Sequence, residues 1–515
     1  MKKAFLILSF TVIYLSLKAQ APAIEWQKSL GGSGDDIAYC IQQTSDGGYI
    51  VAGYGYGNGG DITGNHGGYD YWIVKLTSSG LIQWQKSLGG SNWEFAYSIV
   101  QTTDSGYIVA GYSQSTDGNV TYNNGLADFW IVKLSNSGNL QWQKSFGGSQ
   151  NDIANSIIQT TDGGYIIAGS STSNDGDVFG HHGSTDFADF WIVKINDTGV
   201  IQWQKSLGGS NNEEAYSIKQ TFDGGYIVTG YTTSNDGDVI GYHGFSDRWV
   251  IKLSSSGDIQ WQKCLGGAID ERGLCIQQTI DGGYIVTGAS NSNDGDVSGN
   301  QGGLDFWVVK LSSIGDIQWQ KCLGGTNDDG SASIQQTSDG GYITAGMTES
   351  NNEDVAGNHG IVGSDDYWVV KMTSKGDIQW QKCLGGNNID EALSIKQTYD
   401  KGYIVAGFSK SNDGNVTGNH GNYDYWIVKL ESNEEITTIS NTPAMSITPN
   451  PTKGCITISP SNNVNIKVYN TLGQLIKTAN NTDNISISEF PTGLYFVRLF
   501  NEQGEMIHQE KVIKE

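Results

Sequence analysis

One short phrase, Asp-x-Trp followed by two aliphatic residues and lysine, occurs seven times in this chain and constrains its fold more than any other feature. The copies begin the segments 70–76, 128–134, 189–195, 247–253, 305–311, 366–372 and 424–430. A second phrase, Trp-Gln-Lys, begins at Trp26, Trp84, Trp142, Trp203, Trp261, Trp319 and Trp380, at intervals of 58 residues that lengthen twice to 61. The two phrases contain all but one of the 15 tryptophans, and the exception is Trp93. A fixed period of this length is typical of propellers, solenoids and other repeat arrays.

Each period contains four apolar-patterned segments, which in the second repeat are residues 96–102, 106–112, 128–134 and 140–146. All four combine alternation with β-branched and aromatic residues, which indicates strands, and none has a helical period. A Thr-x-Asp-x-Gly turn separates the first two segments, and a Ser/Asn-Gly turn separates the last two. These tight turns predict one four-stranded antiparallel blade per repeat.

The seventh repeat ends at residue 430 without a Trp-Gln-Lys strand, whereas the chain begins with an unpaired one, residues 24–30. An N-terminal strand that completes the last blade closes a ring and removes two free sheet edges. The sequence therefore predicts an all-β, seven-bladed β-propeller over residues 21–430. This closure resembles that of WD-repeat propellers, although the Trp-Asp dipeptide of that family is missing.

The repeated phrases also resemble tandem β-propeller repeats of secreted bacterial and archaeal surface proteins. The resemblance rests on Trp-Gln-Lys-Ser-Leu-Gly-Gly, Thr-x-Asp-Gly-Gly-Tyr-Ile-Val-Ala-Gly and Asp-Tyr/Phe-Trp-Ile-Val-Lys, and it covers about residues 24–430. It implies the fold and a surface location. That family has no uniform activity.

Both ends of the chain carry targeting signals. Residues 1–20, with Lys2 and Lys3 before an apolar run, indicate a secretory signal peptide. No later stretch is apolar enough to cross a bilayer, so we expect no transmembrane segment in the mature protein. Residues 431–443 form a polar linker.

Residues 444–515 contain about seven short strands and predict a small immunoglobulin-like β-sandwich. This segment resembles the type A C-terminal sorting domain of the type IX secretion system of Bacteroidetes. The matching motifs are Thr-Pro-Asn-Pro-Thr-Lys-Gly at 448–454, Val-Tyr-Asn-Thr-Leu-Gly-Gln at 468–474, Pro-Thr-Gly-Leu-Tyr-Phe-Val at 491–497 and Lys-Val-Ile-Lys-Glu at 511–515. The resemblance implies that the type IX machinery is a partner of residues 444–515, and that the protein is secreted or held on the outer cell surface.

The net charge indicates which partners the protein can bind, and the cysteine positions indicate which disulfide bonds it can form. The net charge is −24, and because residues 1–20 carry +3 and residues 443–515 are balanced, residues 21–442 hold −27. Such a field repels nucleic acid and anionic lipid, so we expect no nucleic-acid partner, and it favours solubility or the binding of cations. The six cysteines mostly exchange with serine between repeats, and only Cys264 and Cys275 are placed for a disulfide bond.

The predicted topology puts the long loop between the second and third strands on the same face as the loop that crosses to the next blade. Both three-residue insertions fall in the long loop, which points to this face as the binding face. The Asn-Asp-Gly-Asp runs in these loops make Asp175, Asp177, Asp236, Asp238, Asp294 and Asp296 candidate ligands for Ca²⁺. The same runs are also ordinary turn signals, and none has the full spacing of a calcium loop.

No catalytic residue stands out. Histidines at 66, 182, 243, 359 and 420, and the seven Asp and Lys residues of the repeats, recur too regularly for an asymmetric catalytic site, which favours structural roles. Thr-x-Asp-x-Gly partly resembles the Asp-box of sialidases, but an arginine cluster for the substrate is absent. Trp93 with the adjoining Glu94 is a candidate ligand-binding pair, because an exposed tryptophan can stack on a sugar ring or pack on the next blade.

These observations favour a secreted, cell-surface propeller that is a non-enzymatic binding module for a glycan or a surface protein. Two alternatives stay open. The acidic loop face could hold the site of a polysaccharide hydrolase or lyase, because acidic residues are plentiful there, although no pair of carboxylates stands apart from the repeat pattern. The propeller could also be a structural adhesin that only presents its loops. A symmetric, glutamine-lined channel (Gln42, Gln101, Gln159, Gln220 and equivalents) would favour binding or scaffolding.

Overall fold

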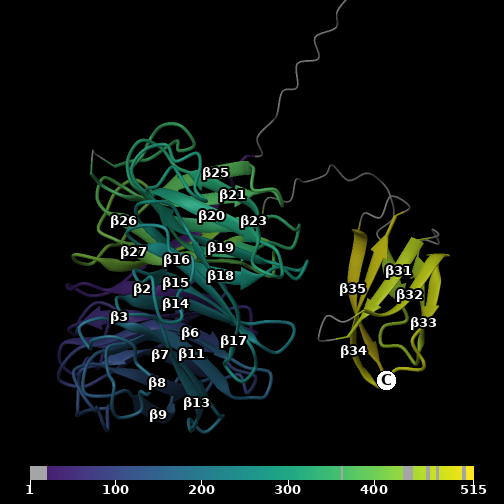
Figure 1. Ribbon diagram of the computed structural model, residues 1–515. Helices are drawn as coiled ribbons and strands as arrows, with labels where there is room; N and C mark the ends of the chain where they lie inside the picture. Colours follow the sequence, from purple (N-terminus) through teal and green to yellow (C-terminus); the bar gives the residue numbers. More distant parts are fainter. Residues whose placement is uncertain (1–19, 361–362, 433–444, 460–463, 471–474, 502–505) are drawn as a thin grey trace, which may run out of the picture. The chain divides into compact units, whose positions relative to one another are not determined.

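The computed structural model describes residues 20–515 except 361–362, 433–444, 460–463, 471–474 and 502–505. The expected signal peptide therefore lies outside the described residues apart from Gln20, as does most of the expected linker and part of the 468–474 motif. The chain divides into two compact units, residues 1–433 and 434–515 (Figure 1). Every regular element in the described ranges is a β-strand, and no helix there is long and apolar enough to span a membrane.

Unit one contains 28 strands, β1 to β28, arranged as seven four-stranded antiparallel sheets. The first strands of the blades are β2 (Ile37–Gln43), β6 (Glu94–Gln101), β10 (Asp152–Gln159), β14 (Glu213–Gln220), β18 (Glu271–Gln278), β22 (Asp329–Gln336) and β26 (Asp390–Gln397). The second strands are β3 (Tyr49–Tyr56), β7 (Tyr107–Ser113), β11 (Tyr165–Ser171), β15 (Tyr226–Thr232), β19 (Tyr284–Ser290), β23 (Tyr342–Thr348) and β27 (Tyr403–Ser409). The third strands are β4 (Tyr69–Leu76), β8 (Asp128–Leu134), β12 (Asp189–Ile195), β16 (Asp247–Leu253), β20 (Asp305–Leu311), β24 (Asp366–Met372) and β28 (Asp424–Leu430). The fourth strands are β1 (Ile24–Leu30), β5 (Ile82–Leu88), β9 (Leu140–Phe146), β13 (Ile201–Leu207), β17 (Ile259–Leu265), β21 (Ile317–Leu323) and β25 (Ile378–Leu384).

The ring closes as the sequence predicts. The seventh blade has the strand order β1-β28-β27-β26, so the N-terminal strand is its outermost member. β1 runs antiparallel to β28, with Lys28 opposite Ile427 and Leu30 opposite Tyr425. Each first strand contacts the first strands of both neighbouring blades, including β26 with β2, and these strands therefore surround the axis. Unit one is a seven-bladed β-propeller, which confirms the predicted fold class.

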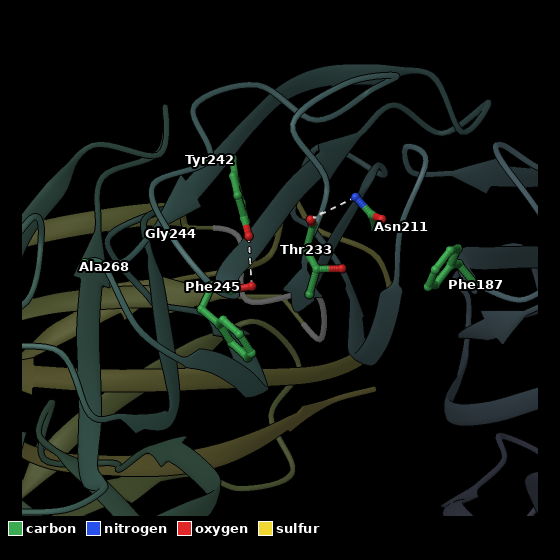
Figure 2. Close-up of a pocket in the computed structure, with 7 residues that line it drawn as sticks. All are labelled: Phe187, Asn211, Thr233, Tyr242, Gly244, Phe245 and Ala268. Atoms are coloured by element: carbon green, nitrogen blue, oxygen red, sulfur yellow. Dashed lines mark hydrogen bonds between the residues drawn. The ribbon is translucent and has the colours of Figure 1, made fainter.

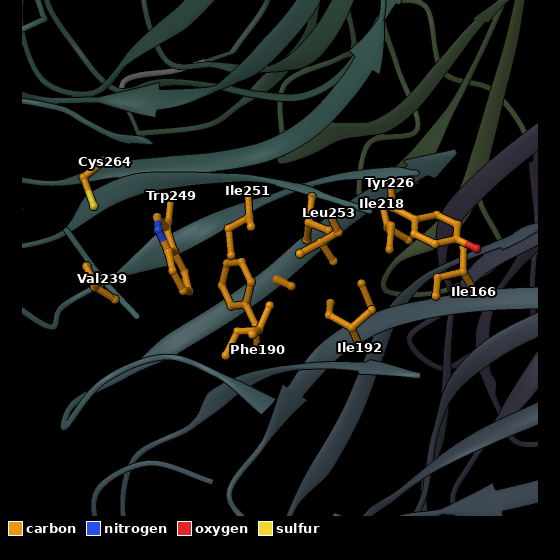
Figure 3. Close-up of a cluster of buried hydrophobic side chains, with 14 residues drawn as sticks. Ile166, Phe190, Ile192, Ile218, Tyr226, Val239, Trp249, Ile251, Leu253 and Cys264 are labelled. Carbon is orange, nitrogen blue, oxygen red and sulfur yellow. The ribbon is translucent and has the colours of Figure 1, made fainter. Parts of the chain in front are cut away.

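The repeated tryptophans hold the blades together. Trp249 of β16 is fully buried in the core between the third and fourth blades, where it lies 4.8 Å from Phe190 of β12 (Figure 3). Its indole N–H donates to Gln262 Oε1 at 2.7 Å on β17. Figure 3 shows Ile192 on the Phe190 side of this core and Ile251 on the Trp249 side. Burying a side chain of this size stabilises each interface by roughly 2–3 kcal/mol.

The face that carries the Thr-x-Asp-x-Gly turns, here called the turn face, is held by a ring of glutamines. Gln101 Oε1 accepts the backbone N–H of Ser45 in the preceding blade at 2.8 Å. Equivalent bonds run from Gln43, Gln159, Gln220, Gln278, Gln336 and Gln397. Gln42 likewise accepts the N–H of Gln101 at 2.9 Å. These amides bond the blades to one another, so the expected glutamine-lined channel is a set of structural contacts.

Each repeated lysine of the third strand also serves the turn face. Lys75 is buried and its Nζ lies 3.0 Å from Asp46 Oδ2 in the turn of the same blade. Thr44 donates to the same carboxylate at 2.5 Å.

The cysteines of the described residues are free, so Cys264 and Cys275 form no disulfide bond.

Unit two has seven strands in two antiparallel sheets that share one apolar core. One sheet contains β29 (Ser446–Thr448), β30 (Cys455–Ser459) and β33 (Asn484–Ser486), and the other contains β31 (Val464–Tyr469), β32 (Leu475–Thr482), β34 (Gly493–Phe500) and β35 (Met506–Lys514). Ile456 and Ile458 from the first sheet pack with Val468 and Val497 from the second. This is the predicted small β-sandwich, with the expected seven short strands in its described residues.

Candidate functional site

The face opposite the turns, here called the loop face, is formed by the long loops between second and third strands and by the crossing loops between blades. Short parallel bridges tie the end of a long loop to the next crossing loop, as between Ala127 and Asn151 and between Ser246 and Asp270. The described parts of the long loops and of the crossing loops therefore meet on one face, where the sequence predicts the binding face.

The six aspartates proposed as calcium ligands bond the backbone of the crossing loops. Asp175 Oδ1 accepts the N–H of Ser149 at 2.7 Å, and Asp177 Oδ2 accepts the N–H of Gly147 at 3.3 Å. Asp236, Asp238, Asp294 and Asp296 make the same bonds in the next two blades. Within the described residues no group of three His, Cys, Asp or Glu side chains is arranged to hold a metal ion. The Asn-Asp-Gly-Asp loops thus act as clamps between blades.

Two buried carboxyl groups flank a glycine at each junction between blades on this face. At the junction of the second and third blades these are Asp128 and Asp152, and both are fully buried. A Cβ on Gly147 would lie 2.7 Å from Asp128 Oδ1 and 2.5 Å from Asp152 Oδ2, so only glycine fits between them. Burial raises the pKa of Asp128 to about 7 and that of Asp152 to about 6.

One oxygen of the third-strand aspartate has no hydrogen-bond partner within the described residues at any of the seven junctions. These oxygens are the Oδ1 atoms of Asp70, Asp128, Asp189, Asp247, Asp305, Asp366 and Asp424. In five junctions the other oxygen accepts a bond from Nδ1 of a histidine at 2.7–2.8 Å, and these are His66, His182, His243, His359 and His420. Each histidine therefore serves its own junction, as its regular recurrence suggests.

The structure separates the two residues of the predicted binding pair. The Trp93 side chain is 50 % exposed and lies 6.0 Å from the ring of Tyr69 in an edge-on arrangement. Glu94 is fully buried and is the junction carboxylate of its blade, bonded to the N–H of Gly90 at 2.8 Å and the hydroxyl of Ser113 at 2.7 Å. Trp93 is thus available to a ligand, whereas the carboxylate of Glu94 is used inside the protein.

A groove of about 510 Å³ opens on the loop face across the third, fourth and fifth blades. It is lined by Phe187, Asn211, Thr233, Tyr242, Gly244, Phe245 and Ala268. Phe245 is 72 % exposed, and Figure 2 shows it beside Tyr242, with Thr233 and Asn211 between this pair and Phe187. The Tyr242 hydroxyl donates to the carbonyl of Phe245 at 2.8 Å, and Asn211 Nδ2 donates to the carbonyl of Thr233.

The lengthened loop of the third repeat contributes Phe187 to this groove. The loop between β11 and β12 is three residues longer than its counterpart between β7 and β8. Phe187 lies two residues before β12, and its N–H donates to the carbonyl of Ser184 at 3.1 Å. Sequence reasoning located the insertion on this face but missed Phe187 and Phe245, because one exposed phenylalanine in a loop looks like any other until the neighbouring loop is in place.

The lengthened loop of the sixth repeat brings a carboxyl group to the innermost strand of the next blade. Asp365, from the lengthened loop between β23 and β24, hydrogen-bonds through its carboxyl group with Glu391 of β26. Burial and the charge of Glu349 raise the pKa of Asp365 to about 6, and burial and Asp365 raise the pKa of Glu391 to about 7. The other repeats have no such pair, so the expectation that no carboxyl pair departs from the repeat is wrong here.

The architecture defines a class, a surface-type β-propeller of near-identical blades followed by a β-sandwich. Residues 446–515 match the model of the secretion system C-terminal sorting domain. The protein is a secreted, cell-surface repeat propeller that carries the C-terminal sorting domain of the type IX secretion system. Unit two is thus the part that interacts with the secretion machinery.

The chain is also similar to a curated protein and to several solved structures. The chain is 30 % identical over 137 residues to the regulatory protein FlaEY of Caulobacter vibrioides, a match that covers 25 % of this chain and 14 % of that protein. The chain therefore spans about a seventh of the length of this relative.

Among solved structures, a fungal alcohol oxidase of the AA5 family in complex with copper has a TM-score of 0.45 at 11 % identity, with 96 % of this chain and 100 % of that chain covered. The type IX surface component PorZ of Porphyromonas gingivalis has a TM-score of 0.30 at 11 % identity, with 92 % and 64 % covered. At these sequence identities and TM-scores, the activity of a similar protein is not evidence for the activity of this chain.

Proposed function

We propose that the protein is a non-enzymatic binding module of the cell surface, and that it holds a glycan in the loop-face groove between Phe187 and Phe245. The observation that carries this proposal is that the lengthened loop of the third repeat contributes Phe187 to the groove. Two of the seven repeats have a longer loop at this place, and length variation on one face is typical of a binding face.

The chemistry of the groove suits a sugar. Phe245 and Phe187 offer flat apolar faces that can cover the C–H face of a pyranose ring. The amide of Asn211 and the backbone near Thr233 supply donors and acceptors for hydroxyl groups. A few polar groups among aromatic side chains are the usual composition of a small-molecule site.

Binding of neutral oligosaccharides to the full chain, measured by isothermal titration calorimetry, tests the proposal. Phe245→Ala should weaken binding about tenfold, because it removes the largest exposed face of the groove. Ile240→Ala is the matched control, since Ile240 is an equally exposed apolar residue of the same loop and does not line the groove. Unchanged affinity in Phe245→Ala, or no binding of any glycan, would contradict the proposal and favour the structural adhesin.

The alternative of a polysaccharide hydrolase has one observation in its favour, the Asp365–Glu391 pair. Glycosidases, however, hold their two carboxyl groups about 5–5.5 Å or about 6.5–9.5 Å apart. The hydrogen bond between Asp365 and Glu391 brings their carboxyl groups closer than either arrangement. Reducing-sugar release by the full chain that disappears in Glu391→Gln would establish the enzyme, and binding without release would leave the binding module.

A further inference from the structure

One level of the propeller axis carries different side chains in different blades. It is the position two residues before the threonine of each Thr-x-Asp-x-Gly turn, and it is here called the axial level. All seven side chains there are partly exposed although they belong to the innermost strands, so solvent reaches the axis at this level. In chain order the residues of the axial level are Gln42, Val100, Ile158, Lys219, Gln277, Gln335 and Lys396.

The innermost strands also direct backbone N–H groups toward the axis beside this level. The N–H groups of Gln101, Gln336 and Gln397 point away from the second strand, since each donates at 2.8–2.9 Å to the axial-level glutamine of the preceding blade. All seven first strands share one register with their second strands, so the four other N–H groups have the same direction. In the blade before each of these four, the axial level holds a valine, an isoleucine or a lysine, and none of these side chains can accept a hydrogen bond. The four groups belong to Gln43, Gln159, Gln220 and Gln278.

The side chains of the axial level add further donors. The amide oxygens of its three glutamines bond the next blade, and within the described residues their Nε2 groups donate to no protein atom. The ammonium groups of Lys219 and Lys396 likewise have no hydrogen bond or ion pair in the described part of the chain. Five successive blades, the fourth to the seventh and then the first, thus present amide or ammonium donors. The second and third blades present the apolar Val100 and Ile158 instead.

The described carboxylates near these two lysines are engaged elsewhere. Each turn aspartate is ion-paired at 2.9–3.0 Å with the third-strand lysine of its own blade. The carboxylates of the first strands lie in the first two residues of these strands, at the loop-face end. There Glu214 accepts the Tyr216 hydroxyl at 2.7 Å, and Glu391 is hydrogen-bonded to Asp365. Two positive charges therefore stay unpaired in a unit whose net charge is strongly negative.

The surroundings of Lys219 disfavour its charged form. Burial lowers the pKa of Lys219 most; the thiol of Cys275 opposes this change, and the charge of Lys396 adds to it. Charged groups away from water are normally paired, because an unpaired one loses hydration without compensation. A bound anion would supply the missing counter-charge.

The distribution of donors indicates which anion fits. An oxyanion takes N–H and ammonium donors without needing any acceptor from the protein. Phosphate or sulfate would turn an oxygen atom toward Val100 and Ile158, where no donor meets it, whereas an organic carboxylate has one apolar side. We propose that the axial level binds a small organic carboxylate, with its oxygens at Lys219 and Lys396 and its apolar part against Val100 and Ile158. This site is separate from the groove on the loop face and does not depend on it.

Binding of acetate, butyrate and benzoate to the full chain, measured by isothermal titration calorimetry at constant ionic strength, tests the site. We expect butyrate to bind more tightly than acetate, because its longer chain reaches the apolar side chains. Lys219→Gln and Lys396→Gln should each lower the affinity about tenfold or more, since a hydrogen bond to a charged group is lost. Lys375→Gln removes an exposed charge from the turn between β24 and β25 and is the matched control.

The lysine variants should fold, because glutamine occupies the axial level in three other blades. Without ligand, Lys219→Gln should melt at the same temperature as the unaltered protein or above it, since it removes an unpaired charge and offers an acceptor to the N–H of Gln278. A lower melting temperature would contradict the argument from unpaired charge. Phe245→Ala, in the groove, should bind carboxylates unchanged.

Three results would overturn the proposal. Equal affinity in Lys219→Gln and the unaltered protein, or no binding of any carboxylate, would remove the site. Tighter binding of phosphate or sulfate than of butyrate would overturn the choice of an organic carboxylate. Equal loss of affinity in Lys375→Gln would mean that the anions respond to overall charge and not to the axial level.

Discussion

The turn face and the loop face of the propeller are built from the same seven repeats, yet they differ in how closely the repeats agree. On the turn face, all seven glutamines make the same bond to the preceding blade, and Thr-Asp-Lys contacts recur from blade to blade. On the loop face, insertions and aromatic substitutions make each junction different at its surface. This contrast indicates that the symmetric contacts form the stabilising frame, and these departures from symmetry lie on the face that we propose as the binding face.

Loss of the strand that closes the ring should lower the thermal stability of the propeller more than any other single change. Deleting residues 20–30 removes β1, exposes the edge of β28, and takes Glu25 and its 3.0 Å ion pair away from Lys429. We expect the cooperative thermal transition, measured by calorimetry, to be lost or lowered by more than about 10 °C, since free edges and a broken core both destabilise the fold. Deleting residues 503–515 from the second unit should leave the propeller transition in place. An unchanged transition after loss of β1 would contradict the closure.

A buried and a half-exposed tryptophan should differ in how much they stabilise the propeller. Trp307→Ala, at a fully buried frame position, should lower the free energy of unfolding by about 3–5 kcal/mol. Trp93→Ala, at a half-exposed loop-face position, should change it by less than about 0.5 kcal/mol. Urea denaturation followed by fluorescence measures both. Equal losses in the two variants would mean that Trp93 is part of the frame.

The two faces should respond to pH in opposite directions. Burial raises the folded-state pKa of Asp128 to about 7, so its stabilisation is complete below the unfolded value of 3.8 and is lost as pH rises through about 7. Partial burial opposes the shift of Asp104 on the turn face, but bonds from Thr102, Lys133 and Gly106 lower its pKa to about 2. The stabilisation from Asp104 is therefore present above 3.8 and lost as pH falls through about 2.

Melting temperatures across pH 2 to 8 check this pair of expectations. Asp128→Asn should flatten the loss between pH 4 and 7, and this junction has Asn124 in place of histidine, so no histidine there complicates the titration. Asp104→Asn should flatten only the acid limb. If Asp128→Asn leaves the neutral limb unchanged, the buried carboxyl groups of the loop face do not titrate as described.

Loss of a single glutamine of the ring should have the smallest effect on the free energy of unfolding. Gln159→Ala removes the acceptor for the N–H of Thr103 at 2.8 Å and should cost about 1 kcal/mol of unfolding free energy. Gln83→Ala, at an exposed position of β5, is the control and should be neutral. A loss in Gln159→Ala as large as that in Trp307→Ala would show that the ring, and not the aromatic core, holds the blades.

Most of the fold could be predicted from the sequence because every blade repeats the same evidence. The strand positions, the number of blades and the closing strand all followed from spacing, although β6 begins at Glu94, two residues before the expected start. The residues of the candidate site were harder to predict from the sequence. The Asn-Asp-Gly-Asp loops offered carboxylates for a metal, but their oxygens bond the preceding crossing loop, a partner that local sequence does not reveal.

Local pattern by itself determined the blade, its turns, the ring closure and the sorting domain, because hydrophobic alternation and turn chemistry act within a few residues of one another. Only the tertiary structure decided which loop residues meet. Phe187 and Phe245 lie 58 residues apart in sequence and face one groove, and Asp365 reaches Glu391 on the next blade. Such contacts depend on how neighbouring blades pack, which one repeat does not encode.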